Sequence, residues 1–297
     1  MTGYASSPPP GGKPREAERT VAGWPLPNGR TVGIDGPGEV FVREVDGPPG
    51  APVVVLLHGL GATSGLQFFA TMNQLSETFR VIAPDMRTPV DGSGKRRAFS
   101  LEHAADDVAA VLDASGVQRA LVVGYSIGGF VAQVLVQQRP DLVAGIVYVA
   151  TVGQTPAWLW PKPLDAISAV VRGIPRPPAR TAGPQQVPDN TTPGFVRWLM
   201  DEIGKLDVPM MLDALDAMLH FRPLDPNPAD DLPVAFIVTT RDRLVPPSWQ
   251  RAFATRSPIA PVYEVSAGHA ASGLAPDRFG PIALQACCEI ARRARLN

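Results

Sequence analysis

Short, continuous apolar runs that alternate with helix-like segments constrain the fold of this sequence most. The runs lie at residues 53–57, 80–83, 120–123 and 145–150. A strand that is apolar at every position is buried on both faces, as in a parallel sheet covered by helices on both sides. The helices expected between them lie at residues 66–77, at residues 100–115 and in a segment that ends near residue 138. The alternation predicts an α/β fold with a doubly wound, mostly parallel sheet.

The alternation stops at residue 151 and returns near residue 231. Residues 151–230 are rich in proline and contain one helical pattern at 192–219. The elements predicted beyond them are strands at 234–239 and 262–265 and a helix at 276–293. We therefore expect one core built from residues 26–150 and 231–297, with residues 151–230 inserted as a largely helical cap. Sheets of this kind bind ligands at the carboxyl edge of their strands, which is where such a cap is expected to lie.

The N-terminal residues have a different composition from the rest of the chain. Residues 1–25 are rich in Pro, Gly and Ser and lack the charged start and apolar run of a secretory signal. We expect a disordered leader there. An antiparallel hairpin is predicted next, with strands near 30–34 and 40–45 around the Gly-Pro-Gly at 36–38.

Composition excludes several functional classes. The chain has a net charge of −1 and scattered basic residues, which argues against a nucleic-acid groove or an anionic membrane surface. No stretch approaches the roughly 20 consecutive apolar residues of a membrane span. Cys287 and Cys288 are adjacent on a predicted helix and point in different directions, so we expect two free thiols and a reducing, cytoplasmic location. No Cys/His cluster has zinc-ligand spacing, and we expect neither a metal nor a cofactor.

The segment Gly124-Tyr125-Ser126-Ile127-Gly128 has the pattern G-x-S-x-G between a predicted strand and a predicted helix. Such a turn strains the serine backbone, and the flanking glycines leave room for the chain to approach itself closely. The hydroxyl then stands clear of the sheet edge, and the N-terminus of the following helix favours negative charge developing there. The pattern predicts Ser126 as a nucleophile.

A serine nucleophile needs a base, and the chain has four histidines. His269 lies in a glycine-containing loop directly after a predicted strand, from which it can reach the sheet edge near Ser126. His103 is expected on a helix and His220 near the end of the cap, so we interpret both as packing or surface residues. His58 is interpreted as a residue that shapes its loop. The predicted base is therefore His269.

The histidine in turn needs a carboxylate on its second ring nitrogen. Asp242 follows the predicted strand at 234–239, which places it at the carboxyl end of that strand. It is therefore the predicted acid, with a structural salt bridge to the adjacent arginines as the alternative. Asp85 also ends a strand, and we expect it to fix a loop near the site.

These segments together resemble the α/β-hydrolase superfamily over roughly residue 40 to the C-terminus outside the cap. The stretch His58-Gly59-Leu60-Gly61 is similar to the oxyanion loop of that superfamily. The resemblance implies that the backbone N–H groups of Leu60 and Ile127 bind the oxyanion of the reaction. Many relatives have an Arg-Gly-His-Gly-like stretch at 87–92, where this chain reads Arg-Thr-Pro-Val-Asp-Gly, so that loop is expected to have a different shape.

The same resemblance separates classes within the superfamily. The chain order of Ser126, Asp242 and His269 is the order of its catalytic triads. A serine at this position excludes the haloalkane dehalogenases and epoxide hydrolases, which have an aspartate there. Ala270 after the histidine weakens the assignment to carbon–carbon bond hydrolases, which often have a tryptophan at that position.

The resemblance implies a cap-bearing bacterial esterase-like serine hydrolase that cleaves carboxylic esters of small or medium apolar acyl groups. Carbon–carbon bond hydrolysis and cofactor-free perhydrolase or haloperoxidase chemistry on the same triad remain alternatives. A non-catalytic binder of a small molecule is the alternative from another class. Large apolar side chains of the cap are the predicted substrate contacts, namely Trp158, Trp160, Met210, Met211 and Met218.

Overall fold

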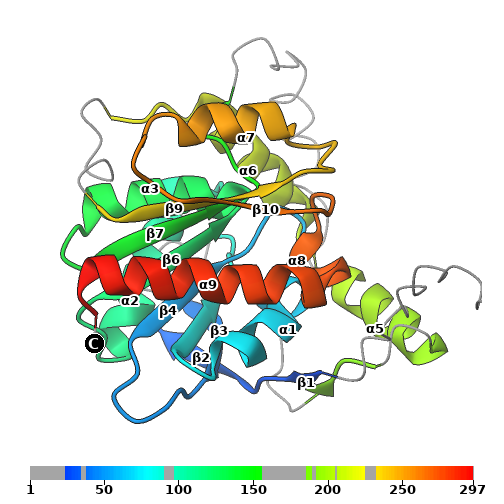
Figure 1. The fold of residues 1–297 in the computed structure, drawn as a ribbon. Helices are drawn as coiled ribbons and strands as arrows, with labels where there is room; N and C mark the ends of the chain where they lie inside the picture. The colour runs from blue at the N-terminus through cyan, green and yellow to red at the C-terminus, as the bar shows by residue number, and fades with distance from the viewer. Residues whose placement is uncertain are drawn as a thin grey trace, which may run out of the picture.

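The computed structural model describes residues 24–34, 38–89, 97–155, 185–188, 192–204, 206–224 and 232–296. These residues form an eight-stranded sheet in the order β10-β9-β7-β6-β4-β5-β3-β2 (Figure 1). Its strands are β2 (Gly29–Gly33), β3 (Glu39–Val45), β4 (Val53–Leu57), β5 (Arg80–Pro84), β6 (Ala120–Tyr125), β7 (Val143–Val149), β9 (Val234–Thr239) and β10 (Val262–Val265). β3 pairs antiparallel with β2 and β5, and all neighbours from β5 to β10 are parallel. The predicted α/β class, mostly parallel sheet and opening hairpin are confirmed.

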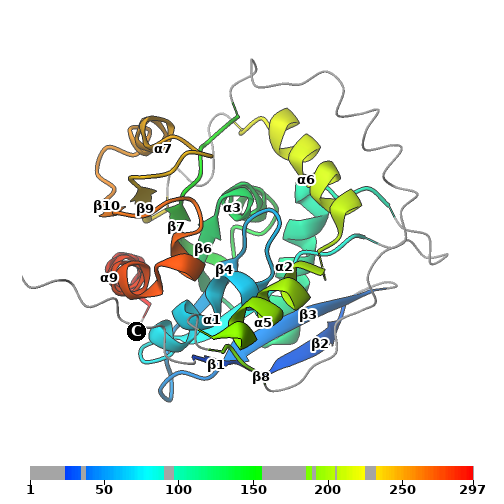
Figure 2. The same cartoon turned by 90° about the vertical axis from the view of Figure 1, so that its right-hand side faces the viewer.

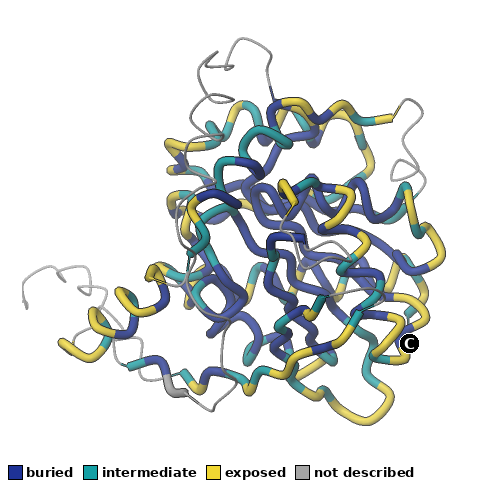
Figure 3. The backbone as a smooth tube through the Cα atoms, turned by 180° about the vertical axis from the view of Figure 1, so that it is seen from behind, coloured by how far each residue is buried: buried dark blue, intermediate teal, exposed yellow. Residues whose placement is uncertain are grey.

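Helices cover both faces of the sheet because the central strands are apolar on both sides. They are α1 (Ser64–Leu75), α2 (Leu101–Ala114), α3 (Ile127–Gln138) and α9 (Pro276–Ala294). In β4, Val55 and Leu57 join the core cluster of α2 and α3, whereas Val54 and Leu56 join that of α1 and α9. Figure 2 shows α9 and α2 on opposite sides of β4 and β6. Every residue of β6, β7 and β9 is buried (Figure 3).

The helical pattern at 192–219 forms two helices instead of one. They are α5 (Pro193–Gly204) and α6 (Val208–His220). Asp207 starts the second helix, since its side chain accepts a hydrogen bond from Met210 N at 3.1 Å. Pro209 in the first turn has no N–H to satisfy, so it tolerates this position. The N-cap Asp207 and the first-turn Pro209 therefore begin a second helix within a continuous apolar pattern.

Four further elements have no counterpart in the sequence prediction. The helices α7 (Pro247–Ala254) and α8 (Ala271–Leu274) follow β9 and β10. The two-residue strand β1 (Pro25–Leu26) pairs antiparallel with β8 (Gln185–Gln186). Pro25, which we expected within a disordered leader, therefore begins a strand. Residues 1–23 of that leader lie outside the described residues.

Two features bear on the environment of the protein. Within the described part of the chain, no helix has the length and apolar character that a membrane crossing requires. Cys287 is buried and Cys288 exposed, and both are free thiols, as predicted. Burial raises the pKa of both thiols. Both are therefore protonated near neutral pH.

Candidate active site

Ser126 occupies the sharp turn between β6 and α3, with φ 52° and ψ −119°. A non-glycine residue in this region carries backbone strain of about 1–3 kcal/mol, which the surrounding structure has to hold. The flanking glycines make the turn possible. A Cβ on Gly124 would lie 2.7 Å from Gly128 O, and one on Gly128 would overlap the backbone carbonyl of Leu57.

Neighbouring strands hold this strained turn in place. Ser126 N donates to Val149 O at 2.9 Å, which extends the pairing of β6 with β7 through the turn. The hydroxyl of Thr151, just beyond β7, donates to Ser126 O at 2.7 Å. Gly129 N donates to the same carbonyl at 2.9 Å. The position of Ser126 is therefore fixed by contacts on both sides of its peptide.

The three side chains singled out as nucleophile, base and acid lie in one hydrogen-bonded row. His269 Nε2 lies 3.0 Å from Ser126 Oγ, and His269 Nδ1 lies 2.7 Å from Asp242 Oδ2. They come from the turn after β6, the loop after β9 and the loop after β10. In this arrangement the imidazole can accept the serine proton while the carboxylate holds its other nitrogen protonated.

Asp242 lies in a cradle of donors that keeps its carboxyl group ionised. Its Oδ1 accepts from the backbone N–H groups of Leu244 and Val245, both at 2.9 Å. Its Oδ2 accepts from Thr239 Oγ1 at 2.8 Å in addition to His269. Burial acts to raise the pKa of Asp242, but these hydrogen bonds outweigh it and hold the pKa below its ordinary value.

Gln250 of α7 stabilises the loop of Asp242 through hydrogen bonds. Its Nε2 donates to Val245 O at 2.7 Å and to Thr239 Oγ1 at 2.9 Å, and it lies 3.2 Å from Asp242 Oδ2. Its Oε1 accepts from Thr239 N at 3.0 Å. One buried carboxamide thus connects the end of β9 to the loop that carries the acid.

The loop that carries His269 is fixed by a residue of the serine turn itself. The hydroxyl of Tyr125 donates to His269 O at 2.6 Å and accepts from Ala271 N at 3.1 Å. Its ring lies edge-on to the imidazole, with centroids 6.0 Å apart. Burial raises the pKa of Tyr125, so this hydroxyl keeps the proton that it donates.

The loop after β4 carries Leu60, whose backbone N–H is one of the two expected to bind the oxyanion. The preceding amide, Gly59 N, donates to Gln67 Oε1 at 2.6 Å. His58 Nε2 accepts from Met86 N at 2.9 Å, so its proton is on Nδ1, which lies 2.9 Å from Gly59 O. His58 therefore connects this loop to the segment after β5. This agrees with the expectation that His58 shapes its loop. The other expected donor, Ile127 N, is at the N-terminus of α3.

The remaining polar candidates lie outside the row of Ser126, His269 and Asp242. Asp85 Oδ1 accepts from Ser64 N at 2.6 Å at the start of α1, which fixes the end of the loop after β4. His103 lies at the start of α2, with its Nδ1 2.9 Å from Ser100 Oγ. His220 ends α6 and is exposed, 3.3 Å from Asp216.

A mostly apolar pocket of about 330 Å³ lies beside the row of Ser126, His269 and Asp242, and His269 lines it. The core contributes the loop after β4, Gln67 and the segment from His269 to Leu274, and α5 contributes Phe195, Trp198 and Leu199. Helix α5 is held to the core by Glu202, which is fully buried and accepts from Thr63 Oγ1 at 3.0 Å. Sequence reasoning missed the α5 residues, because it weighted the methionines of the cap over its other apolar side chains.

The three methionines expected to contact substrate do not line this pocket. Met210 is 8% exposed and belongs to the core cluster of α2 and α3, and Met218 packs against the same cluster. Met211 packs against Gly61 of the loop after β4. The sequence did not reveal which face of α6 meets the core, and the structure turns Met210 inward. Trp158 and Trp160 lie outside the described residues.

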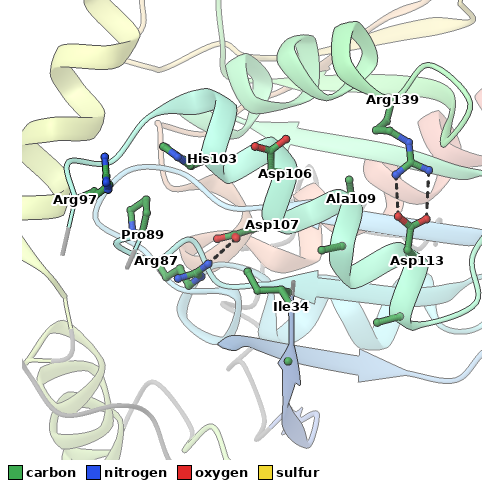
Figure 4. A pocket seen from close by; sticks show the side chains of 13 residues that line it. Ile34, Arg87, Pro89, Arg97, His103, Asp106, Asp107, Ala109, Asp113 and Arg139 are labelled. Atoms are coloured by element: carbon green, nitrogen blue, oxygen red, sulfur yellow. Dashed lines mark hydrogen bonds and ion pairs between the residues drawn. The ribbon is translucent and has the colours of Figure 1, made fainter. Parts of the chain in front are cut away.

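A larger cavity of about 660 Å³ lies along α2 (Figure 4), and Ser126, His269 and Asp242 are not among its lining residues. Several of its charged side chains pair with each other. Arg87 lies 2.8 Å from Asp107, and Arg139 lies 2.8 Å from Asp113. Among the described residues, no group of three or more His, Cys, Asp or Glu side chains is arranged to hold a metal ion.

Comparison with known proteins gives related sequences and folds. The family model described as alpha/beta hydrolase fold matches residues 52–187. The chain is 34% identical over 110 residues to a putative carbamate hydrolase, RutD, of Cronobacter turicensis, covering 36% of this chain and 41% of the relative. It is 37% identical over 115 residues to the bifunctional esterase/perhydrolase DCH of Acinetobacter calcoaceticus, covering 38% and 41%. These matches span about two fifths of the length of either relative.

Solved structures extend the likeness over most of the chain. A hydrolase from Pseudomonas aeruginosa PA01 superposes with a TM-score of 0.66 at 22% sequence identity, covering 86% of this chain and 97% of that one. At this identity the likeness concerns the fold. The family match over residues 52–187, the sheet order and the position of the serine turn agree with it, and the chain has the α/β-hydrolase fold.

Proposed function

We propose that the protein is a serine hydrolase that cleaves carboxylic esters with a small or medium, mostly apolar acyl group. The observation that carries this proposal is the row from Ser126 through His269 to Asp242, with contacts of 3.0 and 2.7 Å beside an apolar pocket of about 330 Å³. A protein that only binds a ligand has no evident use for this arrangement. It has no need of a strained backbone at Ser126 or of an ionised Asp242 that orients the imidazole of His269. The substrate is a small molecule, and the pocket takes its acyl group.

In the first half of the reaction, Ser126 Oγ attacks the ester carbonyl carbon while its proton passes to His269 Nε2. The carbonyl π electrons move to the oxygen, and the backbone N–H groups of Leu60 and Ile127 donate to the resulting oxyanion. Collapse of this intermediate breaks the bond to the alcohol oxygen, which takes the proton from His269. Asp242 stays ionised throughout and stabilises the imidazolium.

In the second half, His269 takes a proton from a water molecule that attacks the acyl-enzyme carbonyl. The second tetrahedral intermediate collapses, and Ser126 Oγ leaves and regains its proton from the imidazolium. The product is a carboxylic acid. The strain at Ser126 is present before substrate binds, so no backbone rearrangement is needed to present the hydroxyl.

A fluorophosphonate probe and a panel of p-nitrophenyl esters test this assignment. The native protein should be labelled at Ser126 and should hydrolyse short and medium acyl esters. Ser126→Ala should abolish labelling and lower turnover by about 10⁴-fold or more, with an unchanged circular dichroism spectrum. A purified, folded protein that is neither labelled nor active would be a binder, whereas turnover retained in Ser126→Ala would refute the nucleophile.

A second candidate reaction uses the same acyl-enzyme. One relative is a bifunctional esterase/perhydrolase. In this chain, perhydrolysis would consist of attack by hydrogen peroxide in place of water and would release a peracid. Peracid formation from an ester and peroxide, absent in Ser126→Ala, would support it. If the protein releases only carboxylic acid in the presence of peroxide, its reaction is ester hydrolysis and not perhydrolysis.

The proposal includes a cytoplasmic location and a cap formed by residues 151–230. The two free thiols support the location, because an exposed thiol such as Cys288 persists in a reducing compartment. The cap is supported by α5, which lies between β7 and β9 in the sequence and lines the pocket. Fractionation of the native host with an antibody against the protein would test the location.

A further inference from the structure

Gln67, near the start of α1, places its carboxamide next to the nucleophile. A Cβ built on Gly59 would lie 3.3 Å from Gln67 Oε1 and 3.4 Å from Ser126 Cβ, so both groups border the same glycine. Gly59 N donates to Gln67 Oε1 at 2.6 Å. Because a backbone N–H can only donate, the oxygen of the carboxamide has to face Gly59. The NH₂ group, Nε2, therefore points elsewhere.

Among the described residues, Gln67 Nε2 has no hydrogen-bond partner. The atom is also not one of the fully buried polar atoms that lack a partner. It therefore keeps some accessible surface, although Gln67 as a whole is only 8% exposed and lines the pocket. A donor held in place by its own oxygen and open to a pocket is suited to bind an acceptor on a ligand.

The other polar side chains among the described residues of the pocket do not offer such a donor. The hydroxyl of Tyr125 donates to His269 O, and the imidazole of His269 is part of the catalytic row. Trp198 Nε1 and Ser272 Oγ are fully buried atoms, closed to the pocket space. Gln67 Nε2 is thus the side-chain donor that the described pocket presents to a substrate.

We propose that Gln67 Nε2 donates a hydrogen bond to an acceptor oxygen in the acyl group of the substrate, close to the scissile carbonyl. The preferred substrates are then esters with a mostly apolar acyl chain that contains one ether, keto or hydroxyl oxygen. This inference rests on the proposed ester hydrolysis and names its substrate class more closely. A plain alkyl chain at this place would leave the donor unpaired in the closed complex, which costs free energy.

Acyl chains of equal length that differ by one oxygen test the proposal. The substrates are p-nitrophenyl hexanoate and its 3-oxa, 4-oxa and 5-oxa analogues, in which an ether oxygen replaces one methylene. Each kcat/KM is divided by the rate of hydroxide-catalysed hydrolysis, which removes differences in intrinsic reactivity. We expect one analogue to exceed hexanoate by about three- to tenfold in the native protein, the effect of a single uncharged hydrogen bond.

Two variants of Gln67 separate substrate binding from support of the loop after β4. Gln67→Met removes both the donor and the acceptor, and Gln67→Glu keeps an acceptor for Gly59 N while replacing the donor with an oxygen. Both should reduce the ratio of the preferred analogue to hexanoate to about one. If Gln67 only supported Gly59, Gln67→Glu would keep that support and Gln67→Met would lose it, so their turnover would differ equally for every substrate. The ratio of the preferred analogue to hexanoate would then stay at its native value in both variants.

Gln74→Met is the matched control, because it makes the same change two turns further along α1, where the side chain packs against Gly280 of α9. It should keep the native ratio. A native ratio of one for all three analogues, or a ratio that changes equally in Gln67→Met and Gln74→Met, would overturn the proposal. Failure of ester hydrolysis itself is distinguishable, since hexanoate would then not be cleaved at all.

Discussion

His269 Nδ1 lies 2.7 Å from Asp242 Oδ2, and the Asp242 side chain has no exposed surface. Among the described residues, the ion pair of this carboxylate is with His269 and not with the adjacent Arg241 or Arg243, which was the alternative role considered for it. Its remaining lone pairs accept from Leu244, Val245 and Thr239. Asp242 is therefore oriented by its own loop before it orients the imidazole.

This geometry predicts a large effect of Asp242→Asn on turnover. The amide cannot hold a proton on His269 Nδ1 as the carboxylate does, so the imidazole is left in the wrong tautomer to accept the proton of Ser126. We expect turnover to fall by up to about 10⁴-fold with the fold retained. Asp85→Asn should have a smaller effect, since Asp85 contacts the start of α1 and not the imidazole. A larger loss of turnover in Asp85→Asn would show that the acid has been misassigned.

The lowered pKa of Asp242 predicts how stability depends on pH. Because the folded-state pKa lies below the unfolded-state value of about 3.9, the ionised carboxylate stabilises the fold fully above that value. This contribution is lost as the pH falls through the folded-state pKa. The difference in unfolding free energy between the native protein and Asp242→Asn should thus be constant near neutral pH and shrink below about pH 4.

Urea denaturation at a series of pH values measures this difference. Ser126→Ala retains the pair of Asp242 and His269, so it should follow the pH profile of the native protein and serve as the control. A difference that grows on acidification would mean that the pKa of Asp242 is raised, contrary to its hydrogen bonding.

The sequence predicted the serine turn well because its determinants are local. The requirement for glycine at 124 and 128 follows from backbone contacts within the turn and with β4, and both are visible in a five-residue pattern. The positions of Asp242 and His269 were predictable for a related reason, since each lies in the loop after a strand and the carboxyl ends of parallel strands meet at one edge. Strand position alone was enough to bring the candidates together.

Residues that support the site from other elements were not predictable in the same way. Gln250 reaches Asp242 from α7, a short helix that begins at a proline. Gln67 reaches the pocket from α1, where the sequence shows only a polar residue among apolar ones. Tyr125 lies inside the recognised motif, yet nothing in that motif indicates that its hydroxyl holds the His269 loop. Such roles depend on contacts between elements far apart in the chain.

The serine turn also predicts a sharp contrast between two glycine substitutions. A Cβ on Gly128 would overlap the backbone carbonyl of Leu57, so Gly128→Ala should force β4 and α3 apart. We expect a loss of stability at or above the upper end of the 1–3 kcal/mol typical of overpacking, about 3 kcal/mol, together with lost turnover. Gly33→Ala is the control, because no atom lies within 4 Å of the added Cβ, and its change should stay within about 0.5 kcal/mol. Similar urea midpoints for the two variants would contradict the packing at the turn.

The last prediction distinguishes the pocket wall from the core of the cap. Leu199 of α5 lines the pocket, whereas Met210 of α6 is buried in the core. Leu199→Ala enlarges the pocket, so the acyl chain preferred in kcat/KM should become longer, with each added methylene worth up to about 0.8 kcal/mol, or about fourfold. Met210→Ala should leave the chain-length profile unchanged and lower the unfolding free energy by about 2–5 kcal/mol. The measurements are kcat/KM for p-nitrophenyl esters of two to ten acyl carbons and the urea midpoint of each variant. A profile that shifts in Met210→Ala and not in Leu199→Ala would place the acyl group against α6 and refute the assignment of this pocket.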